Sequence, residues 1–322
     1  MTLKALVVGL GQIGMGYDLK LDPRTYALTH ARAFQQHPRF SLIGGVDADL
    51  SRCRLFEEHY GCTAYTDLEE ALQITQPDVI AIATPTSLHG ATLRTILDFA
   101  EPTAILCEKP LSYDLAEAHL MVKDCIARKC GLYVNYMRRS DPGMVEVKRR
   151  LNTARIGRPL KGIAWYSKGL FHNGSHSFNL LQFWLGEMKD FKVIAAGRIW
   201  DGRDPEPDVH VVFEHGTVNF LAAWEENYSH ATIELVTPNG RLRLEQGGEQ
   251  IIWQPTVKDA IIDGYTVLSP AEDRIETDMI RSQWNVVDQL ATSLDGLTAQ
   301  ICSGGSALKT LESLEKIRVC II

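Results

Sequence analysis

Short apolar runs alternate with amphipathic stretches through the first 135 residues of the chain. The apolar runs cover residues 5–9, 41–46, 78–83, 103–107 and 132–135. Each run is apolar on both faces, which is typical of a parallel strand that helices cover on both sides. The stretches between them, such as 50–60, 87–99 and 115–128, have the apolar spacing of helices. This alternation predicts a doubly wound parallel sheet of the α/β class, the Rossmann architecture.

The pattern changes after about residue 155, where strand-like segments follow one another with tight turns. Segments 230–236 and 241–245 flank Pro238-Asn239-Gly240, which is a strong hairpin signal. Segments 209–213 and 218–224 flank a short turn at 214–216. Apolar and polar residues alternate along these segments, so the pattern predicts an antiparallel sheet with one buried face.

We therefore predict two domains. Residues 1–135 form a dinucleotide-binding Rossmann domain, and residues 136–322 form an α+β domain with a mainly antiparallel open sheet, for substrate binding and oligomerisation. Segments 281–294 and 306–318 have helical spacing, and we expect them to pack back toward the domain junction.

Charge and cysteine content narrow the classes of partner. The chain of 322 residues has a net charge of −7 and no basic tract, which argues against nucleic acid as a partner. No apolar run approaches the roughly 20 residues that span a bilayer. The chain enters a strand within a few residues of Met1, which leaves no room for a signal peptide. Seven cysteines without a CxxC pair argue against a disulfide framework. These features predict a reduced, cytoplasmic protein with no membrane partner.

A glycine-rich turn follows the first predicted strand. Residues 9–14 match G-x-G-x-x-G, a pattern that is weak alone but stronger directly after a strand near the N-terminus. The glycines allow a tight turn and let backbone N–H groups approach a pyrophosphate closely. A helix that begins behind the turn directs the positive end of its dipole at the phosphates.

The acidic residue that should bind the adenosine ribose is Asp47, at the end of the second predicted strand. It lies 33 residues after Gly14, whereas the usual spacing is about 20 residues. We explain the excess by an inserted loop within residues 15–29, with the helix proper beginning near His30. The Asp47 carboxylate would bind a free ribose 2′-hydroxyl and repel a 2′-phosphate, which favours NAD over NADP.

Three further segments are candidates for the binding cleft, because ligands of open parallel sheets bind at the carboxyl ends of the strands. They are residues 83–89, residues 107–110 and, in the second domain, residues 170–179. With residues 9–14, the combination of Thr84-Pro85, His89 and Glu108-Lys109-Pro110 resembles the glucose–fructose oxidoreductase, inositol dehydrogenase and rhizopine-catabolism family, Gfo/Idh/MocA. His30-Ala31 and residues 135–139, followed by Asp141-Pro142, also resemble motifs of this family.

The resemblance implies hydride transfer between NAD and a carbon that bears a hydroxyl or carbonyl group, on a sugar or cyclitol. Lys109 matches the active-site lysine of the family, whose ammonium would hold the reacting oxygen and stabilise negative charge on it. The following Pro110 would have the cis peptide bond of the family. The resemblance and the glycine motif together predict these cofactor contacts: Gly9, Gly11, Gln12, Ile13, Gly14, Asp47, Thr84, Pro85, His89, Glu108 and Lys109.

The second-domain motif of the family, Asp-x-Gly-x-His-x-x-Asp, is altered in this chain to His172-x-Gly174-x-His176-x-x-Asn179. His176 keeps its place in the motif and inherits the acid–base role at the substrate hydroxyl. The role of His172 stays open among a substrate hydrogen bond, shared proton transfer, a metal ligand and a structural role. No cysteine or carboxylate neighbour completes a metal set, so we predict no metal site.

The substrate-binding candidates are His172, Tyr136, Arg139, Lys168 and Asn173. We expect a small sugar or nucleotide-sugar substrate. The resemblance favours oxidation of the 3-hydroxyl of UDP-N-acetylglucosamine in the biosynthesis of surface-polysaccharide sugars of lipid A or O-antigen. The alternative is a catabolic inositol or aldose dehydrogenase, and a non-catalytic NAD-binding regulator is a further one. The half-polar sheet and the resemblance predict a homodimer or homotetramer.

Overall fold

The computed structural model describes residues 2–158 and 160–321, which divide into two compact units. The first unit comprises the residues up to 140 together with 280–309, and the second comprises 141–279 together with the residues from 310 onward. Residues 280–309 thus belong with the Rossmann part, whereas the sequence placed one boundary after residue 135.

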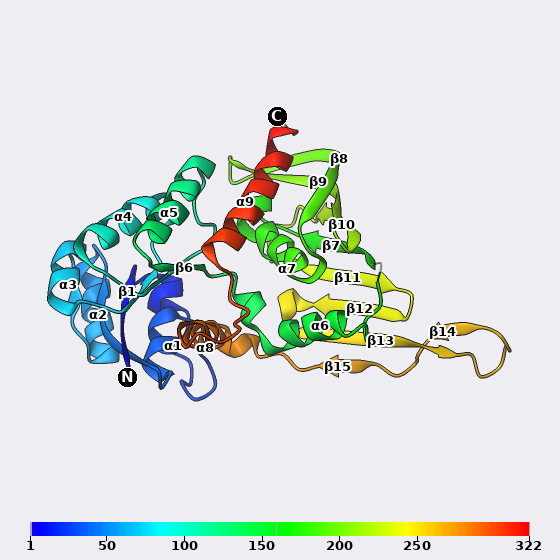
Figure 1. The fold of residues 1–322 in the computed structure, drawn as a ribbon, viewed down its shortest axis with the longest axis horizontal. Coiled ribbons are helices and arrows are strands. Elements are labelled where there is room, and N and C mark those ends of the chain that lie inside the picture. The colour runs from blue at the N-terminus through cyan, green and yellow to red at the C-terminus, as the bar shows by residue number, and fades with distance from the viewer. Residues whose placement is uncertain (1, 159, 322) are drawn as a thin grey trace. The chain divides into compact units, whose positions relative to one another are not determined.

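The first unit contains a six-stranded sheet in the order β3-β2-β1-β4-β5-β6. Figure 1 labels β1 and β6 of this sheet. Every pair of neighbouring strands is parallel, so the predicted doubly wound Rossmann sheet is confirmed. The strands are β1 (Leu3–Val8), β2 (Phe40–Val46), β3 (Ala64–Tyr65), β4 (Val79–Ile82), β5 (Ala104–Cys107) and β6 (Gly131–Val134). The sequence did not reveal β3, because two residues are too short for a pattern.

Helices follow most of these strands. They are α1 (His30–Gln36), α2 (Leu50–Tyr60), α3 (Leu68–Thr75), α4 (His89–Phe99), α5 (Leu115–Ala127) and α8 (Ser282–Leu294), with short turns η1 (Gln12–Gly16), η2 (Thr86–Leu88), η3 (Met137–Ser140) and η6 (Met279–Arg281). Helix α9 (Gly304–Val319) is divided between the units. None of the described helices is long and apolar enough to cross a membrane.

Helix α8 belongs to the core of the first unit. Val286, Val287 and Leu290 are buried in the same apolar cluster as Ala31 and Phe34 of α1. An amphipathic pattern shows that a helix has a buried face, but not which core receives that face. The contribution of α8 therefore had to come from the structure.

The second unit is built on a nine-stranded sheet in the order β14-β13-β12-β11-β7-β10-β9-β8, with β15 beside β13. Only β7 and β10 pair in parallel among its described strands, and both predicted hairpins are present. The strands are β7 (Leu160–Tyr166), β8 (Met188–Trp200), β9 (Asp204–Phe213), β10 (Gly216–Ala222), β11 (Thr232–Thr237), β12 (Gly240–Glu245), β13 (Gln250–Lys258), β14 (Thr266–Leu268) and β15 (Asp273–Ile275). The predicted α+β unit with a mainly antiparallel sheet is confirmed.

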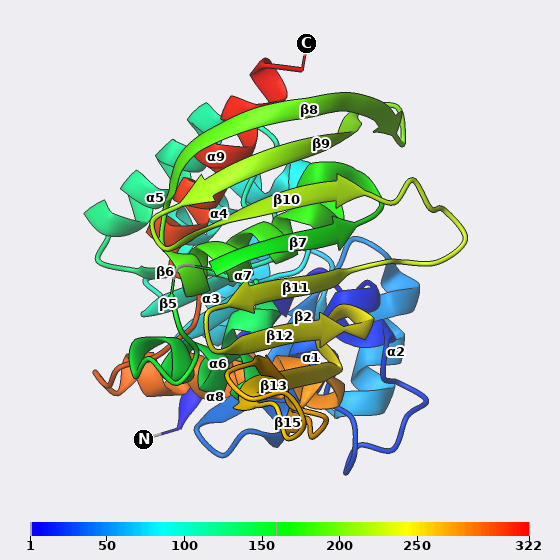
Figure 2. The same cartoon turned by 90° about the vertical axis from the view of Figure 1, so that its right-hand side faces the viewer.

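Helices α6 (Pro142–Asn152) and α7 (Ser175–Leu185) lie on one face of this sheet, and Figure 2 shows the other face toward the viewer. Short turns η4 (Gly169–Gly174) and η5 (Gln246–Gly248) complete the unit. The buried side chains of β12 alternate with half-exposed ones, as expected for a strand with one covered face. On the covered face, α7 contributes the fully buried Trp184 and Phe178.

Candidate functional site

The glycine-rich turn connects β1 to η1, a single π-helical turn. Gly9 has a φ of +97°, and a Cβ there would lie 2.6 Å from the carbonyl carbon of Ala83 at the end of β4. A Cβ on Gly14 would lie 2.0 Å from the Gly9 carbonyl oxygen. At Gly11 a Cβ would meet only an Arg52 nitrogen, at 3.9 Å. The outer two glycines therefore close the turn, while the middle one leaves space for a ligand to approach the backbone.

A cavity of about 500 Å³ opens beside this turn at the carboxyl ends of β1, β2 and β4. Its lining comprises Val8, Gly9, Gly11, Gln12, Ile13, Tyr17, Val46, Asp47, Ala48, Arg52, Thr66, Leu68, Ala83, Thr84, Pro85, Leu88 and Thr92. The size is that of a small-molecule site, and the position is where a Rossmann sheet binds its dinucleotide. Most of the cofactor contacts predicted from the sequence line this one cavity.

Asp47 lies in the cavity wall with a mostly buried side chain. Its Oδ2 accepts a hydrogen bond from the Leu10 backbone N–H at 2.8 Å, and its Oδ1 accepts one from Asp49 N–H at 2.9 Å. Arg52 Nη1 lies 3.3 Å from Oδ2 and is half-exposed. The backbone bonds fix the carboxylate against the glycine turn, which is the place required for a ribose acceptor. The residues present therefore fit a dinucleotide.

His89 is fully buried, although the sequence placed it among the cofactor contacts. Its Nε2 lies 3.0 Å from the Thr84 carbonyl oxygen, and its Nδ1 lies 3.1 Å from that of Pro110 and 3.2 Å from that of Leu111. Burial lowers the pKa of His89, against the opposing effect of these carbonyls. The ring thus connects the loop after β4 to the loop after β5, while Thr84 and Pro85 themselves line the cavity.

Glu108 sits at the carboxyl end of β5 in a polar network. Its Oε1 lies 2.8 Å from Nε2 of the buried His30 and accepts a hydrogen bond from Asn135 Nδ2 at 2.5 Å. The same amide donates to Gln283 Oε1 at 3.0 Å. Burial favours the protonated acid, but the contacts with His30, Asn135 and Lys109 outweigh it and lower the pKa of Glu108. The network therefore keeps a carboxylate directly beside Lys109.

Lys109 follows at the start of the next loop, half-buried, and its peptide bond to Pro110 is cis, as the resemblance implied. Two other predicted residues lie just beyond β6. Tyr136 is buried, and Arg139 donates from Nη1 to Ser306 Oγ at 2.7 Å. Arg139 is thus engaged within the first unit, and its substrate contact remains a prediction.

In the second unit, the predicted histidine motif forms η4, a second π-helical turn, and the first residues of α7. His172 is exposed and stacks on Trp200, with ring centroids 5.0 Å apart and planes 26° apart. Asn173 and His176 are half-buried. Lys168 precedes the turn with a left-handed φ of +62°. The structure therefore gathers Lys168, His172, Asn173 and His176 on one short segment.

Two carboxylates of β9 hold this segment. Asp204 accepts hydrogen bonds from Phe171 N–H at 3.0 Å and His172 N–H at 2.8 Å. Glu206 accepts one from Gly169 N–H at 3.0 Å and one from Arg198 Nε at 2.6 Å. Burial raises the pKa of Asp204 to about 6, with a further contribution from Glu206, against the opposing effect of the backbone N–H groups.

Sequence reasoning missed these anchors. Asp204 and Glu206 are two residues apart on a strand, so their side chains share a face, and two acids on a buried face are a signal that was available. Asn135 and Gln283 carried no comparable signal, because their contacts depend on where α8 packs. Tyr17 was seen only as part of the inserted loop, yet it lines the cavity.

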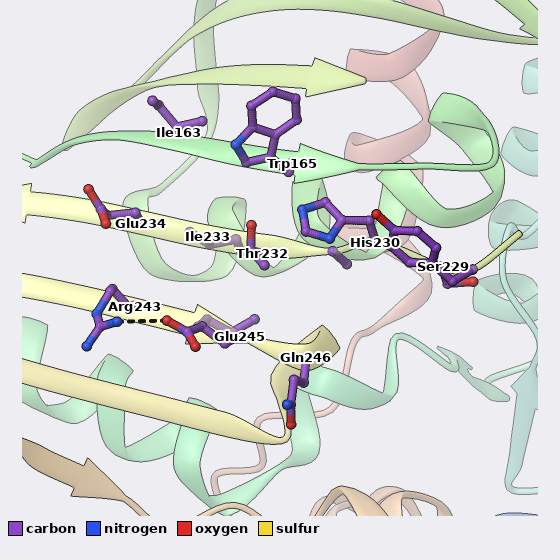
Figure 3. Close-up of a pocket in the computed structure, with 13 residues that line it drawn as sticks. Ile163, Trp165, Ser229, His230, Thr232, Ile233, Glu234, Arg243, Glu245 and Gln246 are labelled. Carbon is purple, nitrogen blue, oxygen red and sulfur yellow. Dashed lines mark hydrogen bonds and ion pairs between the residues drawn. The ribbon is translucent and has the colours of Figure 1, made fainter. Parts of the chain in front are cut away.

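A second hollow of about 600 Å³ lies on the open face of the second unit's sheet (Figure 3). Trp165 and His230 lie side by side at one end of it, and Arg243 forms an ion pair with Glu245 at 2.9 Å at the other. Ile163 and Trp165 are exposed there. The described residues that line this hollow include none of the predicted site residues, so we place the dinucleotide in the first unit.

Comparisons with known proteins agree with this placement. Residues 3–136 match the model of an oxidoreductase family described as having an NAD-binding Rossmann fold. The first unit is thus similar to the NAD-binding Rossmann domain of an oxidoreductase family, and NAD is the cofactor of that domain. The matching model is that of the Gfo/Idh/MocA family, whose motifs the first unit also resembles.

Among curated proteins, inositol 2-dehydrogenase 4 of Saccharopolyspora erythraea is 34% identical over 160 residues, 49% of this chain and 43% of that one. An inositol 2-dehydrogenase of Pseudarthrobacter chlorophenolicus is 29% identical over 62% of this chain and 58% of its own length. The chain thus spans about half the length of the curated relatives it matches.

Solved structures resemble the whole fold. The WlbA dehydrogenase of Bordetella pertussis, solved with NADH and UDP-GlcNAcA, has a TM-score of 0.75 at 17% identity, covering 98% of this chain and 94% of that one. The UDP-N-acetylglucosamine 3-dehydrogenase GnnA of Acidithiobacillus ferrooxidans has a TM-score of 0.77 at 16% identity, covering 99% and 97%. At these identities the likeness establishes the two-unit fold and no more.

Proposed function

We propose that this protein is an NAD-dependent dehydrogenase that oxidises a CH–OH group of a sugar or cyclitol to the ketone, or runs the reverse reduction. The observation that carries the proposal is the position of Lys109. It follows β5, and the cofactor cavity opens at the carboxyl ends of β1 and β4 in the same parallel sheet. Parallel strands end at the same edge, so the lysine and the cofactor cavity share that edge.

Lys109 would hold the reacting oxygen. A fixed ammonium favours the negative charge that develops on a hydroxyl oxygen as its proton leaves, and it polarises a carbonyl in the reverse direction. The nicotinamide, when bound, supplies the hydride acceptor or donor. Glu108, fixed by His30 and Asn135, places a carboxylate directly beside the lysine.

His176 would exchange the substrate proton. Histidine is the side chain whose ordinary pKa is best suited to both accepting and donating a proton near neutral pH. The N-terminal turn of α7 and the anchored η4 segment give its backbone a defined position. His172 and Asn173 on the same segment, with Lys168 before it, would bind substrate hydroxyl or phosphate groups.

For the substrate, we propose a UDP-N-acetylhexosamine oxidised at its 3-hydroxyl. Support comes from Lys168, His172 and His176, which lie in or beside the η4 segment. A lysine and two histidines are better suited to binding a charged diphosphate than to binding a neutral polyol. The fold of the whole chain is also similar to those of two UDP-sugar dehydrogenases. A free inositol is the second candidate, favoured by the names of the curated relatives. Homodimers or homotetramers joined through the open sheet face stay part of the proposal.

The test incubates the purified protein with NAD and, separately, UDP-N-acetylglucosamine, its uronic acid, free inositols and free aldoses, while NADH absorbance is followed. An aminotransferase added with an amino donor removes a ketone that would otherwise run back. Turnover on free polyols alone would contradict the nucleotide-sugar choice. NAD binding without turnover on any member would contradict the dehydrogenase itself and favour a regulator.

A further inference from the structure

The inserted loop begins at the wall of the cofactor cavity. The turn η1 ends at Gly16, and the Tyr17 backbone N–H still donates to the Gln12 carbonyl at 2.9 Å. Tyr17 thus lies one π turn after Gln12, on the same side of the turn. Its side chain is 58% exposed and lines the same cavity as Gly11, Gln12 and Ile13.

The residue after Tyr17 fixes the loop. Asp18 is fully buried, and its carboxylate accepts hydrogen bonds from Leu28 N–H at 2.6 Å, Thr29 N–H at 3.0 Å and Thr29 Oγ1 at 2.8 Å. These three bonds join the first residues of the insertion to its last ones. The insertion is therefore closed at its base, and Tyr17 lies at that base.

A buried arginine completes the closure. Arg32 in the first turn of α1 is almost fully buried, donates from Nη2 to the Asp18 carbonyl oxygen at 2.7 Å and has its Nε 3.7 Å from Oδ1. At the far end of the loop, the Ala27 backbone N–H donates to the Ile280 carbonyl and the Ala27 carbonyl accepts from Gln283 N–H. Both ends of the insertion are thus tied to the core of the first unit.

We propose that Tyr17 is a cofactor-binding residue that the insertion adds to the Rossmann site, contacting the phosphates of the bound dinucleotide. Its neighbours in the cavity wall are Gly11, Gln12 and Ile13, whose backbone N–H groups face the pyrophosphate in this fold. A phenol hydroxyl donates to a phosphate oxygen, and such charge-assisted bonds are stronger than neutral ones. An uninterrupted helix would instead carry residue 17 on into a second turn, away from the phosphates.

The test measures the dissociation constants of NAD and NADH by calorimetry on the full chain, without substrate. Tyr17→Ala is expected to weaken both roughly fivefold to tenfold, the loss of one hydrogen bond of about 1–1.5 kcal/mol. The matched control is Tyr26→Ala, because Tyr26 is the other tyrosine of the insertion and lies outside the set that lines the cavity. Its affinities are expected to equal those of the unsubstituted protein.

An unchanged NAD affinity in Tyr17→Ala would overturn the proposal. Equal weakening by Tyr17→Ala and Tyr26→Ala would also overturn it, because a general loosening of the loop explains that result. If Tyr17→Ala does not fold, Tyr17→Phe takes its place, with the same expected loss of roughly fivefold to tenfold because the same hydroxyl is removed, and an unchanged value as the contrary result. NAD binding is measured without turnover, so failure of the proposed dehydrogenase activity would be seen separately.

Discussion

The two units each contain a π-helical turn next to predicted site residues, and a buried aspartate accepts backbone hydrogen bonds beside the first turn and within the second. In the first unit, Asp18 follows η1 and accepts from the backbone of Leu28 and Thr29. In the second unit, Asp204 accepts from the backbone of Phe171 and His172 within η4. π turns often occur at functional sites because they displace the chain from a regular helix.

The two aspartates, Asp18 and Asp204, differ in the charge around them. Asp18 faces the guanidinium of Arg32, itself buried, whereas Asp204 faces backbone N–H groups and has Glu206 two residues away on the same strand. Removing the carboxylate of a buried ion pair lowers the stability of the fold strongly, because the partner remains as an uncompensated buried charge. Removing the charge of a carboxylate that is held by neutral donors beside another acid lowers the stability less. The protonation of such a carboxylate also changes within an accessible pH range.

The largest expected effect is on turnover, when the proposed catalytic residue of each unit is substituted in turn. Lys109→Met and His176→Ala should each lower turnover on the order of 10²–10⁴-fold, while NAD still binds. The control is His215→Ala, an exposed histidine of the β9–β10 hairpin, with unchanged turnover. Turnover and NAD affinity are measured on the same samples. Near-normal turnover in either site variant would remove that residue from the mechanism.

The next largest effect is on stability, when Asp18 and Asp204 are each replaced by asparagine. Asp18→Asn leaves Arg32 buried without its counter-charge, so we expect a loss of about 3–5 kcal/mol in the free energy of unfolding. Asp204→Asn keeps an acceptor oxygen and removes a charge beside Glu206, so about 1 kcal/mol is expected. Urea unfolding measures both, with the exposed Asp22→Asn of the insertion as a near-neutral control. Equal losses for the two anchors would show that Arg32 does not set the difference.

Much of the first unit followed from its sequence, and the anchors did not, for a physical reason. The glycine turn and Asp47 act through the backbone geometry of one βαβ unit, so local spacing predicts them even across the insertion. The bonds of Asp204 reach back to residues 171 and 172 on another element, and those of Asn135 reach forward to Gln283. Such pairings depend on how elements pack, which residue patterns alone do not specify. The same holds for Tyr17 and Asp18, because residue patterns do not specify the contacts that a loop makes.

A smaller effect sharpens the comparison through pH. The pKa of Asp204 is about 6 in the folded protein, above the ordinary value of 3.8. Between these values the folded state holds a proton that the unfolded state releases, so stability falls as pH rises. This contribution is fully present below pH 3.8 and is lost by the time pH passes 6. Unfolding free energies at a series of pH values from 4 to 7 should show the decline, and Asp204→Asn should flatten it. A variant whose decline matched that of the unsubstituted protein would assign it to other groups.

The smallest effect is on cofactor affinity, when Asp47, which we assign to the ribose, is substituted. Asp47 is held by Leu10 and Asp49 backbone N–H groups, so Asp47→Ala removes a ribose acceptor without leaving a buried counter-charge, since Arg52 is half-exposed. We expect NAD to bind about tenfold more weakly, which is the lower end of the effect of losing one hydrogen bond to a charged group. NADP should gain affinity, because the repulsion of its 2′-phosphate disappears and Arg52 can then pair with it. Arg52→Ala in the same background should remove that gain while NAD affinity stays as in the single variant. An unchanged ratio of NAD to NADP affinity in Asp47→Ala would refute the ribose assignment.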